Sequence, residues 1–126
     1  MQRVMLKSKI HRATITGADL NYIGSITLDT RLMELADIRE HEQVHVVDID
    51  NGARFETYTI AGERGSGELK INGAAARLVH RGDTVILISY AQYDEDELDS
   101  HAPQVVHVTR ENRIAAIDHE VATLLS

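Results

Sequence analysis

The sequence predicts a mainly β protein, folded as one compact barrel of short strands with small helices in the connections. Segments with apolar residues at alternate positions and many β-branched residues recur along the chain, whereas helical patterns are few and short. The chain has 126 residues, of which 43% are hydrophobic and 26% are charged. This length and composition suit one globular domain with one hydrophobic core. We therefore expect a single domain over residues 1–126.

The strands are predicted from the alternation of apolar and polar residues. In chain order they cover residues 4–6, 10–16, 43–49, 55–60, 68–71, 84–90 and 105–109. The stretch 84–90 is apolar almost throughout, which indicates a strand covered on both faces. Between the third and fourth strands, Asn51-Gly52 has the residue types that suit the positive φ angles of a two-residue hairpin turn.

The helices are predicted from caps and spacing. Asp29 or Thr30 can cap a short helix. The apolar side chains of this helix are Leu32, Met33, Leu35 and Ala36. Residues 73–80 offer an alanine-rich turn or two, and the acidic run 94–99 is expected to be solvated. In the C-terminal tail, about residues 111–126, apolar residues recur at helical spacing, so this tail is either an amphipathic helix or a frayed end. These apolar residues are Ile114, Ile117, Val121 and Leu124.

Composition excludes several classes of function. The chain has no cysteine, which rules out disulfides, thiolate nucleophiles and iron–sulfur clusters. Its formal net charge is -7, and without a cluster of Lys and Arg we expect no binding to nucleic acid. Neither a signal peptide nor a membrane-spanning segment is recognisable at the N-terminus, so we expect a cytoplasmic protein that binds no membrane.

The segment His41-Glu42-Gln43-Val44-His45 matches the H-E-x-x-H pattern of zinc peptidases. That pattern binds zinc when both histidines lie one turn apart on one helix face. Here His45 begins an alternating, strand-like run, so we expect the two histidines to belong to a loop and a strand. A zinc hydrolase is kept as an alternative, and so is a non-catalytic barrel that acts as a binding or assembly module.

The dipeptide Gly24-Ser25 is the most informative pair in the chain. Its ordinary structural role would be a turn before a strand. A serine hydroxyl held against the preceding carbonyl can also attack it, and a glycine at that position has no Cβ to obstruct a strained approach. The amide then becomes an ester, and elimination across the serine Cα and Cβ breaks the chain.

Five segments that include this dipeptide together resemble the aspartate 1-decarboxylase family. They are MLKSKIHRA (5–13), DLNYIGS (19–25), NGARFETY (51–58), GERGSG (62–67) and INGAAA (71–76). The segments follow one another at the spacing of the family, and the resemblance covers residues 1 to about 93. The acidic run and the tail beyond it carry little resemblance.

The resemblance implies a double-psi β-barrel and a self-processing enzyme. Cleavage at Gly24-Ser25 would yield a β chain (1–24) and an α chain (25–126) whose first residue, formerly Ser25, is a pyruvoyl group. The amine of L-aspartate would form a Schiff base with this group, which serves as the electron sink for loss of CO2, with neither pyridoxal phosphate nor a metal. The product, β-alanine, would enter the synthesis of pantothenate and coenzyme A.

The family also implies roles for particular side chains. Tyr58 matches the proton donor of the reaction, because a phenol stays protonated near neutral pH. Thr57 matches a residue of processing and substrate contact, although a regular strand would place it on the face opposite Tyr58. Arg54 and Lys9 match the cations that bind the substrate carboxylates.

Further positions match the surroundings of the substrate. Gly73, Ala74 and Ala75 match a loop whose small side chains let the backbone approach the ligand. Supporting roles are implied for Tyr22, Asn72 and His11. The family is homotetrameric with active sites between adjacent subunits, and a maturation factor is left open as a partner.

Overall fold

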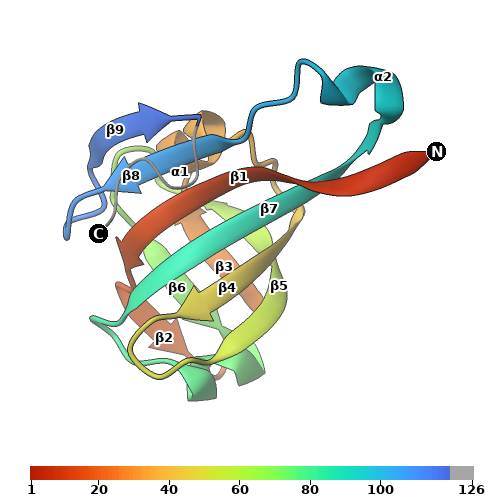
Figure 1. The fold of residues 1–126 in the computed structure, drawn as a ribbon. Helices are drawn as coiled ribbons and strands as arrows, with labels where there is room; N and C mark the ends of the chain where they lie inside the picture. Colours follow the sequence, from red (N-terminus) through yellow and green to blue (C-terminus); the bar gives the residue numbers. More distant parts are fainter. Residues whose placement is uncertain (120–126) are drawn as a thin grey trace.

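The computed structural model of the chain describes residues 1–119 as a mainly β structure (Figure 1). Its strands are β1 (Gln2–Thr14), β2 (Gly17–Asp19), β3 (Ser25–Asp29), β4 (Gln43–Asp48), β5 (Arg54–Gly62), β6 (Leu69–Asn72), β7 (Thr84–Asp94), β8 (Gln104–Val108) and β9 (Ile114–Asp118). Its helices are α1 (Thr30–Leu35), the 3₁₀ helix η1 (Gly73–Leu78) and α2 (Glu95–Leu98).

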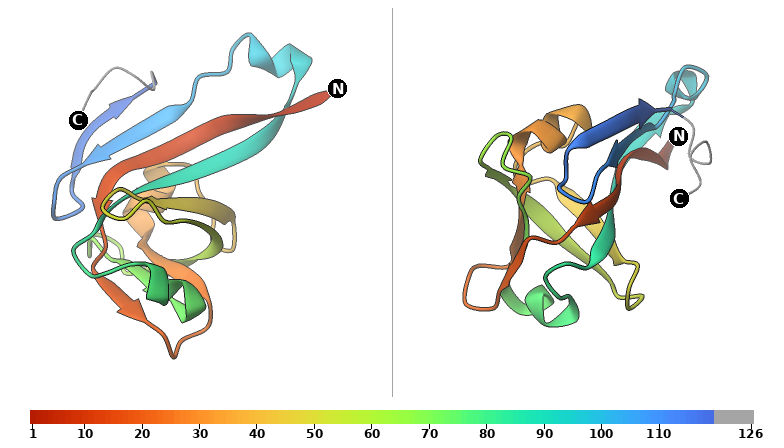
Figure 2. Two further views of the ribbon diagram at one scale, coloured as in Figure 1. Left: turned by 60° about the horizontal axis from the view of Figure 1, so that its bottom comes forward. Right: turned by 90° about the vertical axis from the view of Figure 1, so that its left-hand side faces the viewer.

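The strands form one curled sheet in the order β2-β6-β3-β5-β4-β7-β1-β8-β9. Three neighbouring pairs are parallel, namely β1 with β8, β2 with β6, and β3 with β5. The other neighbouring pairs are antiparallel. Figure 2 shows the sheet wrapping around its interior, with the far ends of β1 and β7 and the helix α2 projecting from the body. This arrangement is consistent with the predicted double-psi β-barrel.

The hydrophobic core lies inside the curled sheet. Every second side chain of the central strands points inward, and the largest fully buried ones include Ile10, Ile26, Leu28, Val44, Val46, Leu69, Ile71, Val85 and Leu87. Truncating one of these buried Leu or Ile residues to Ala typically costs about 2–5 kcal/mol of folding stability. Because the apolar side chains occupy only the inward face, the outward face of the same strands is free for polar and functional side chains.

The predicted helix after residue 29 is confirmed. Asp29 is the N-cap of α1, and its Oδ1 accepts a hydrogen bond from the backbone N–H of Arg31 at 2.9 Å. The same carboxylate also accepts hydrogen bonds from the backbone N–H groups of Gly65 (2.8 Å) and Gly67 (2.9 Å). Asp29 thus ties the start of the helix to the loop before β6. The alanine-rich turn at 73–80 is present as η1.

Several local predictions were wrong. Segment 4–6 and residues 10–14 of segment 10–16 belong to one long strand, β1, which bends through register shifts in its pairing with β7 instead of breaking and ends at Thr14. Asn51-Gly52 does not form a two-residue turn, because Asp48 and Ala53 close the hairpin around four residues and only Gly52 of the pair has a positive φ. The acidic run 94–99 was correctly predicted to be solvated, since all its acidic residues are exposed. It also contains the short helix α2, which has a capping box at Asp94 and was not predicted.

Neither the amphipathic helix nor the frayed end expected for the tail is found at residues 114–118. Residues Ile114–Asp118 form β9, which pairs antiparallel with the edge strand β8. Backbone groups exposed along β8 provide partners that a helix at this place would leave unpaired. Val121 and Leu124 lie outside the described residues. Within residues 1–119, no helix is long and apolar enough to cross a membrane.

Candidate active site

Ser25 is the first residue of β3 and is almost fully buried, with 1% of its surface exposed. Its Oγ donates a hydrogen bond to the carbonyl oxygen of Ile23 at 3.0 Å. The same Oγ accepts a hydrogen bond from Nδ2 of Asn72 at 3.0 Å. The hydroxyl is therefore fixed next to the backbone of the segment that precedes it, as a self-processing serine requires.

Asn72 ends β6 and lies directly opposite Ser25 in the antiparallel register of β3 and β6. Its Nδ2 also donates to Oγ1 of Thr27 at 3.0 Å, so Ser25, Thr27 and Asn72 share one face of the sheet. Asn72 is completely buried, yet its Oδ1 has no hydrogen-bond partner among the described residues. A buried acceptor of this kind is costly unless a donor is supplied.

Gly73 packs against the candidate cleavage site. It adopts a φ of +76°, and a Cβ on it would lie 2.6 Å from Cα of Gly24 and 2.8 Å from the nitrogen of Gly24. Both the dihedral angle and the contact exclude a side chain at Gly73. A Cβ on Gly24 would meet nothing within 4 Å outside its two chain neighbours. The structure thus shows a steric requirement at Gly73 that the sequence analysis did not predict, while the role of Gly24 in the approach of the adjacent Ser25 hydroxyl stays a prediction.

Tyr58 reaches the same region from the other side of β3. Strands β3 and β5 are parallel with Ile26 opposite Thr59, so the preceding residues, Ser25 and Tyr58, stand at the same level of the sheet. Thr59 is fully buried on the core side, and the alternation of β5 places Tyr58, 36% exposed, on the outward face that carries Ser25.

Thr57 lies on the other face of β5. It pairs with the buried Val44 of β4, and the strand has no irregularity between Thr57 and Tyr58. The two residues are therefore not brought together within one chain, as the period of a regular strand predicted.

The predicted cations lie on other strands than Ser25. Lys9 is on β1, which is separated from β3 by β5, β4 and β7, a path of roughly 19 Å along the curled sheet at the usual strand spacing. Arg54 is the first residue of β5, four positions before Tyr58 and on the same face of the strand, and it lines a surface pocket of about 420 Å³. Within residues 1–119, neither cation forms a hydrogen bond or an ion pair with Ser25.

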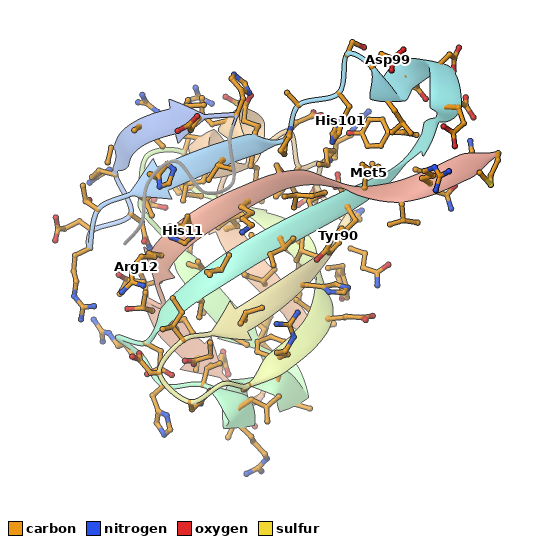
Figure 3. The ribbon with its side chains drawn as sticks, viewed as in Figure 1. Met5, His11, Arg12, Tyr90, Asp99 and His101 are labelled. Atoms are coloured by element: carbon orange, nitrogen blue, oxygen red, sulfur yellow. The ribbon has the colours of Figure 1, made fainter. Side chains whose placement is uncertain are left out.

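His11 also lies on β1, beside β8 (Figure 3). Its ring makes an edge-on contact with the ring of His107, with 5.4 Å between the centroids. Burial lowers the pKa of His11, and the neighbouring His107, Lys9 and Arg12 lower it further. Like Lys9, this residue lies on β1, which β7, β4 and β5 separate from β3 in the sheet.

The remaining predicted residues surround the loop before β3. Tyr22 is 47% exposed, and its carbonyl oxygen lies 3.3 Å from the Cβ position of Gly73. In η1, Ala74 is exposed and Ala75 is partly buried.

The sequence analysis missed Thr27 and Lys70. Nζ of Lys70 lies 5.4 Å from the centroid of the Tyr22 ring, and Lys70 pairs with Thr27 across β6 and β3. Thr27 lies two positions from Ser25 in β3, and Lys70 lies two positions from Asn72 in β6. Because side chains two positions apart in a strand point to the same face, this spacing could have predicted both residues.

The H-E-x-x-H segment lacks the geometry of a zinc site. His41 lies in a loop with a φ of 73°, and His45 lies in β4, as predicted. Glu42 between them accepts hydrogen bonds from Nζ of Lys7 and Oγ of Ser89, both at 2.7 Å. The glutamate that would serve the metal in a peptidase is thus engaged in a structural network.

A comparison with protein families agrees with the geometry around Ser25. The model of the aspartate decarboxylase family matches residues 1–115 of the chain. The chain belongs to the aspartate decarboxylase family. It is therefore a lyase that decarboxylates aspartate. The match continues past residue 93, where the five segments of the sequence analysis end, through β8 and into β9.

The residues around Ser25 fit the pyruvoyl group on which this family depends. Nδ2 of Asn72, which donates to Oγ of Ser25, could donate to a keto oxygen in the same place. Oδ1 of Asn72 is a buried acceptor that lacks a donor within the described part of the chain. The backbone contact of Gly73 with Gly24 keeps side-chain atoms away from the bond that would be cut.

Proposed function

We propose that this protein cleaves itself between Gly24 and Ser25 and then converts L-aspartate to β-alanine and CO2 for the synthesis of pantothenate and coenzyme A in the cytoplasm. The observation that carries the proposal is the buried hydroxyl of Ser25, held between the Ile23 carbonyl and the Asn72 amide next to Gly24. The products of cleavage would be the chains 1–24 and 25–126.

Self-processing begins with the hydroxyl of Ser25. Rotation of the side chain about Cα–Cβ releases Oγ from the Ile23 carbonyl and directs it at the carbonyl carbon of Gly24. The new C–O bond forms as the Gly24–Ser25 C–N bond breaks, and the freed amine takes the proton. Elimination then removes the ester oxygen from Cβ together with the proton on Cα. The resulting dehydroalanine rearranges to an imine, and water hydrolyses the C=N bond, which releases ammonia and leaves the keto group.

In catalysis, the pyruvoyl group supplies an electron sink next to the carbon that loses CO2. Tyr58, exposed beside Ser25 on the outward face of the sheet, holds the proton that is returned to that carbon. The amide of Asn72 orients the reacting end of the chain. The small residues Gly73, Ala74 and Ala75 leave the backbone of η1 open to the substrate.

The two carboxylates of aspartate require positive charge. On the face that carries Ser25, one chain supplies Lys70, which pairs with Thr27, whereas Lys9, His11 and Arg54 lie on other strands than Ser25. We propose a homotetramer in which a neighbouring copy supplies further cations to the outward face that carries Ser25 and Tyr58. This arrangement also accommodates Thr57, which faces away from Tyr58 in its own chain.

The experiment compares Ser25→Ala with Ser66→Ala. Gly65-Ser66 is a second Gly-Ser pair in the chain, located in an exposed turn, and serves as a matched control. The wild type and Ser66→Ala should give bands of about 2.8 and 11 kDa on denaturing gels, scaled from chain length at ordinary residue mass. Ser25→Ala should remain intact and inactive.

Tyr58→Phe separates processing from catalysis. This variant should still cleave itself but lose about 10²–10⁴-fold in turnover of aspartate, the range of general acid catalysis. Formation of β-alanine by intact Ser25→Ala protein would refute the proposed function.

A further inference from the structure

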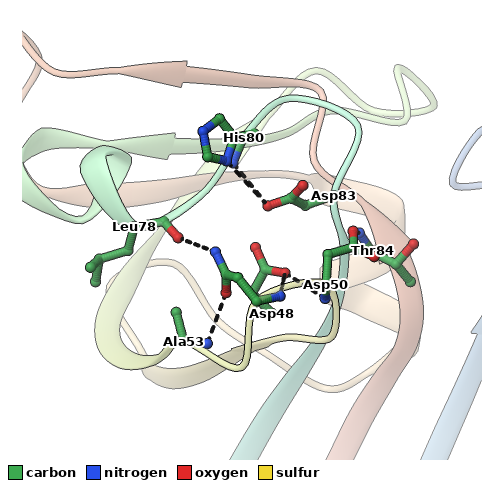
Figure 4. A network of polar contacts seen from close by, with 8 residues as sticks. Asp48, Asp50, Ala53, Leu78, His80, Asp83 and Thr84 are labelled. Atoms are coloured by element: carbon green, nitrogen blue, oxygen red, sulfur yellow. Dashed lines mark hydrogen bonds and ion pairs between the residues drawn. The ribbon is translucent and has the colours of Figure 1, made fainter.

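Three carboxylates meet at one end of the sheet, away from the strand level of Ser25. Asp48 ends β4, Asp50 lies in the connection to β5, and Asp83 directly precedes β7 (Figure 4). Each contributes one oxygen to a group in which all the oxygens lie within 4.8 Å of one another. The cluster joins the β4–β5 connection to the segment that follows η1.

The backbone holds each carboxylate through one of its oxygens. Oδ1 of Asp48 accepts from the N–H of Asp50 at 2.9 Å, and Oδ2 of Asp50 accepts from the N–H of Thr84 at 2.9 Å. Oδ2 of Asp83 accepts from the N–H of His80 at 2.9 Å. The second oxygen of each carboxylate remains available to a ligand.

The buried Asp48 is the observation that points to such a ligand. The residue is completely buried, and its Oδ2 has no hydrogen-bond partner within residues 1–119. This oxygen is directed into the cluster, toward the carboxylate of Asp83. Two carboxylate oxygens are both acceptors, so a shared proton, a bridging water or a cation is needed to join them. Leaving the buried oxygen without any of these is costly, and a cation also offsets the charge of three neighbouring carboxylates.

No cation of the described residues meets this requirement. The ion pair found near the cluster joins Oδ2 of Asp83 to Nδ1 of the exposed His80 at 4.0 Å. It does not involve the buried Oδ2 of Asp48, which is left without a partner among residues 1–119.

We propose that Asp48, Asp50 and Asp83 bind a hard divalent cation of the Ca²⁺ type. Calcium takes carboxylate oxygens at about 2.3–2.6 Å, so two of its ligands can lie up to about 5 Å apart, which matches the spread of this cluster. Magnesium, with ligands at about 2.0–2.1 Å, requires the oxygens to draw closer together. Water completes the coordination on the side of the exposed Asp50.

A cation at this place would reinforce an existing connection. Nδ2 of Asn51 already donates to the carbonyl oxygen of Leu78 at 2.8 Å and so links the β4–β5 connection to the end of η1. The proposed site is structural and separate from the reaction at Ser25. It departs from the expectation of a protein without metal, which concerned the chemistry of the reaction.

To test the proposal, Ca²⁺ is titrated into chelator-treated full-length protein at about pH 7.5. Binding is measured by calorimetry and by the change in melting temperature. We expect one site with a Kd of about 10⁻⁴–10⁻³ M, together with a rise in melting temperature. Asp50→Asn removes an exposed ligand without altering the buried network, and it should weaken binding at least about tenfold. Asp96→Asn, in the exposed acidic helix α2, removes the same charge elsewhere and should bind as the wild type does.

Several outcomes would overturn the proposal. One is the absence of heat and of any shift in melting temperature up to about 10 mM Ca²⁺, well above the expected Kd. Another is an equal loss of binding in Asp50→Asn and Asp96→Asn. A cluster whose stability responds to pH but not to Ca²⁺ holds a proton only, and this also refutes the cation site. Because Ser25→Ala should bind Ca²⁺ as the wild type does, the result is independent of the proposed function.

Discussion

Replacing Gly73 with Ala tests the contact between Gly73 and the candidate cleavage site. Gly73 has a φ of +76°, and the new Cβ would lie 2.6 Å from Cα and 2.8 Å from the nitrogen of Gly24. Both atoms belong to the backbone, so the clash cannot be relieved by rotation of a side chain. The loop at Gly24 has to move, and the Gly24–Ser25 bond moves with it.

The loss of stability in Gly73→Ala has two contributions, backbone strain and overpacking, and a substitution at a second glycine separates them. Gly52 also has a φ of +76°, but a Cβ on it would meet nothing within 4 Å. Gly52→Ala therefore bears only the strain of a left-handed backbone, about 1–2 kcal/mol. Gly73→Ala bears this strain and an overpacking cost of about 1–3 kcal/mol. We expect total losses of about 2–5 kcal/mol for Gly73→Ala.

Two assays measure the consequences. Urea unfolding is carried out in a Ser25→Ala background, so that both variants are compared as intact chains. Cleavage is followed by intact-mass spectrometry in chains that retain Ser25. Gly73→Ala should be less stable than Gly52→Ala and should cleave much more slowly, whereas Gly52→Ala should cleave at the rate of the wild type. Equal stability and equal cleavage rates in the two variants would refute the role assigned to the Gly73–Gly24 contact.

Three further predictions concern buried polar groups. Asn72→Leu removes the donor to Ser25 and should cost about 1–3 kcal/mol in urea unfolding, and a variant as stable as the wild type would contradict the network described here. Burial raises the pKa of Glu42, but the hydrogen bonds to its carboxylate lower it by more, so the pKa in the folded protein lies below 4.5. Ionised Glu42 therefore stabilises the folded protein above pH 4.5, and this stabilisation is lost as the pH falls through the lower pKa of the folded state. Glu42→Gln should therefore lose about 1–3 kcal/mol near pH 7 and show a smaller loss at acidic pH, as measured by unfolding at both values. The pKa of Asp48 is raised from 3.8 to about 6, so without divalent cations the free energy of unfolding should fall as the pH rises from 3.8 to about 6 and level off above that. The fall is at most about 3 kcal/mol, and less because the pKa of Asp83 is lowered; Asp48→Asn should abolish it.

Much of the local structure could be predicted from consecutive residues. The alternation in segments 43–49 and 55–60 predicted β4 and β5, and the apolar run 84–90 predicted most of β7. The position of Asp29 before an apolar helical pattern predicted the cap of α1. These features depend on the side-chain period of one segment or on hydrogen bonds within a few residues, so they can be recognised without knowledge of the partner strands.

The resemblance to the family predicted the residues of the candidate site but not their contacts. Ser25 and Asn72 are far apart in the chain and meet because β3 and β6 pair in one register. The tail shows the converse, since the spacing of Ile114 and Ile117 fits a helix, whereas pairing with β8 makes this segment a strand. The short strand β2 has too few residues to show a period and was not predicted.

The amino-acid sequence by itself determined the strand-rich class, the caps and the family, because each is encoded in short runs of side chains. Only the tertiary structure decided that Gly73 lies against Gly24, that Oδ1 of Asn72 is buried without a donor among residues 1–119, and that Asp48 faces Asp83. The physical reason is that these neighbours come from different strands and turns. Their proximity is decided by the register between distant segments and by burial in a common core.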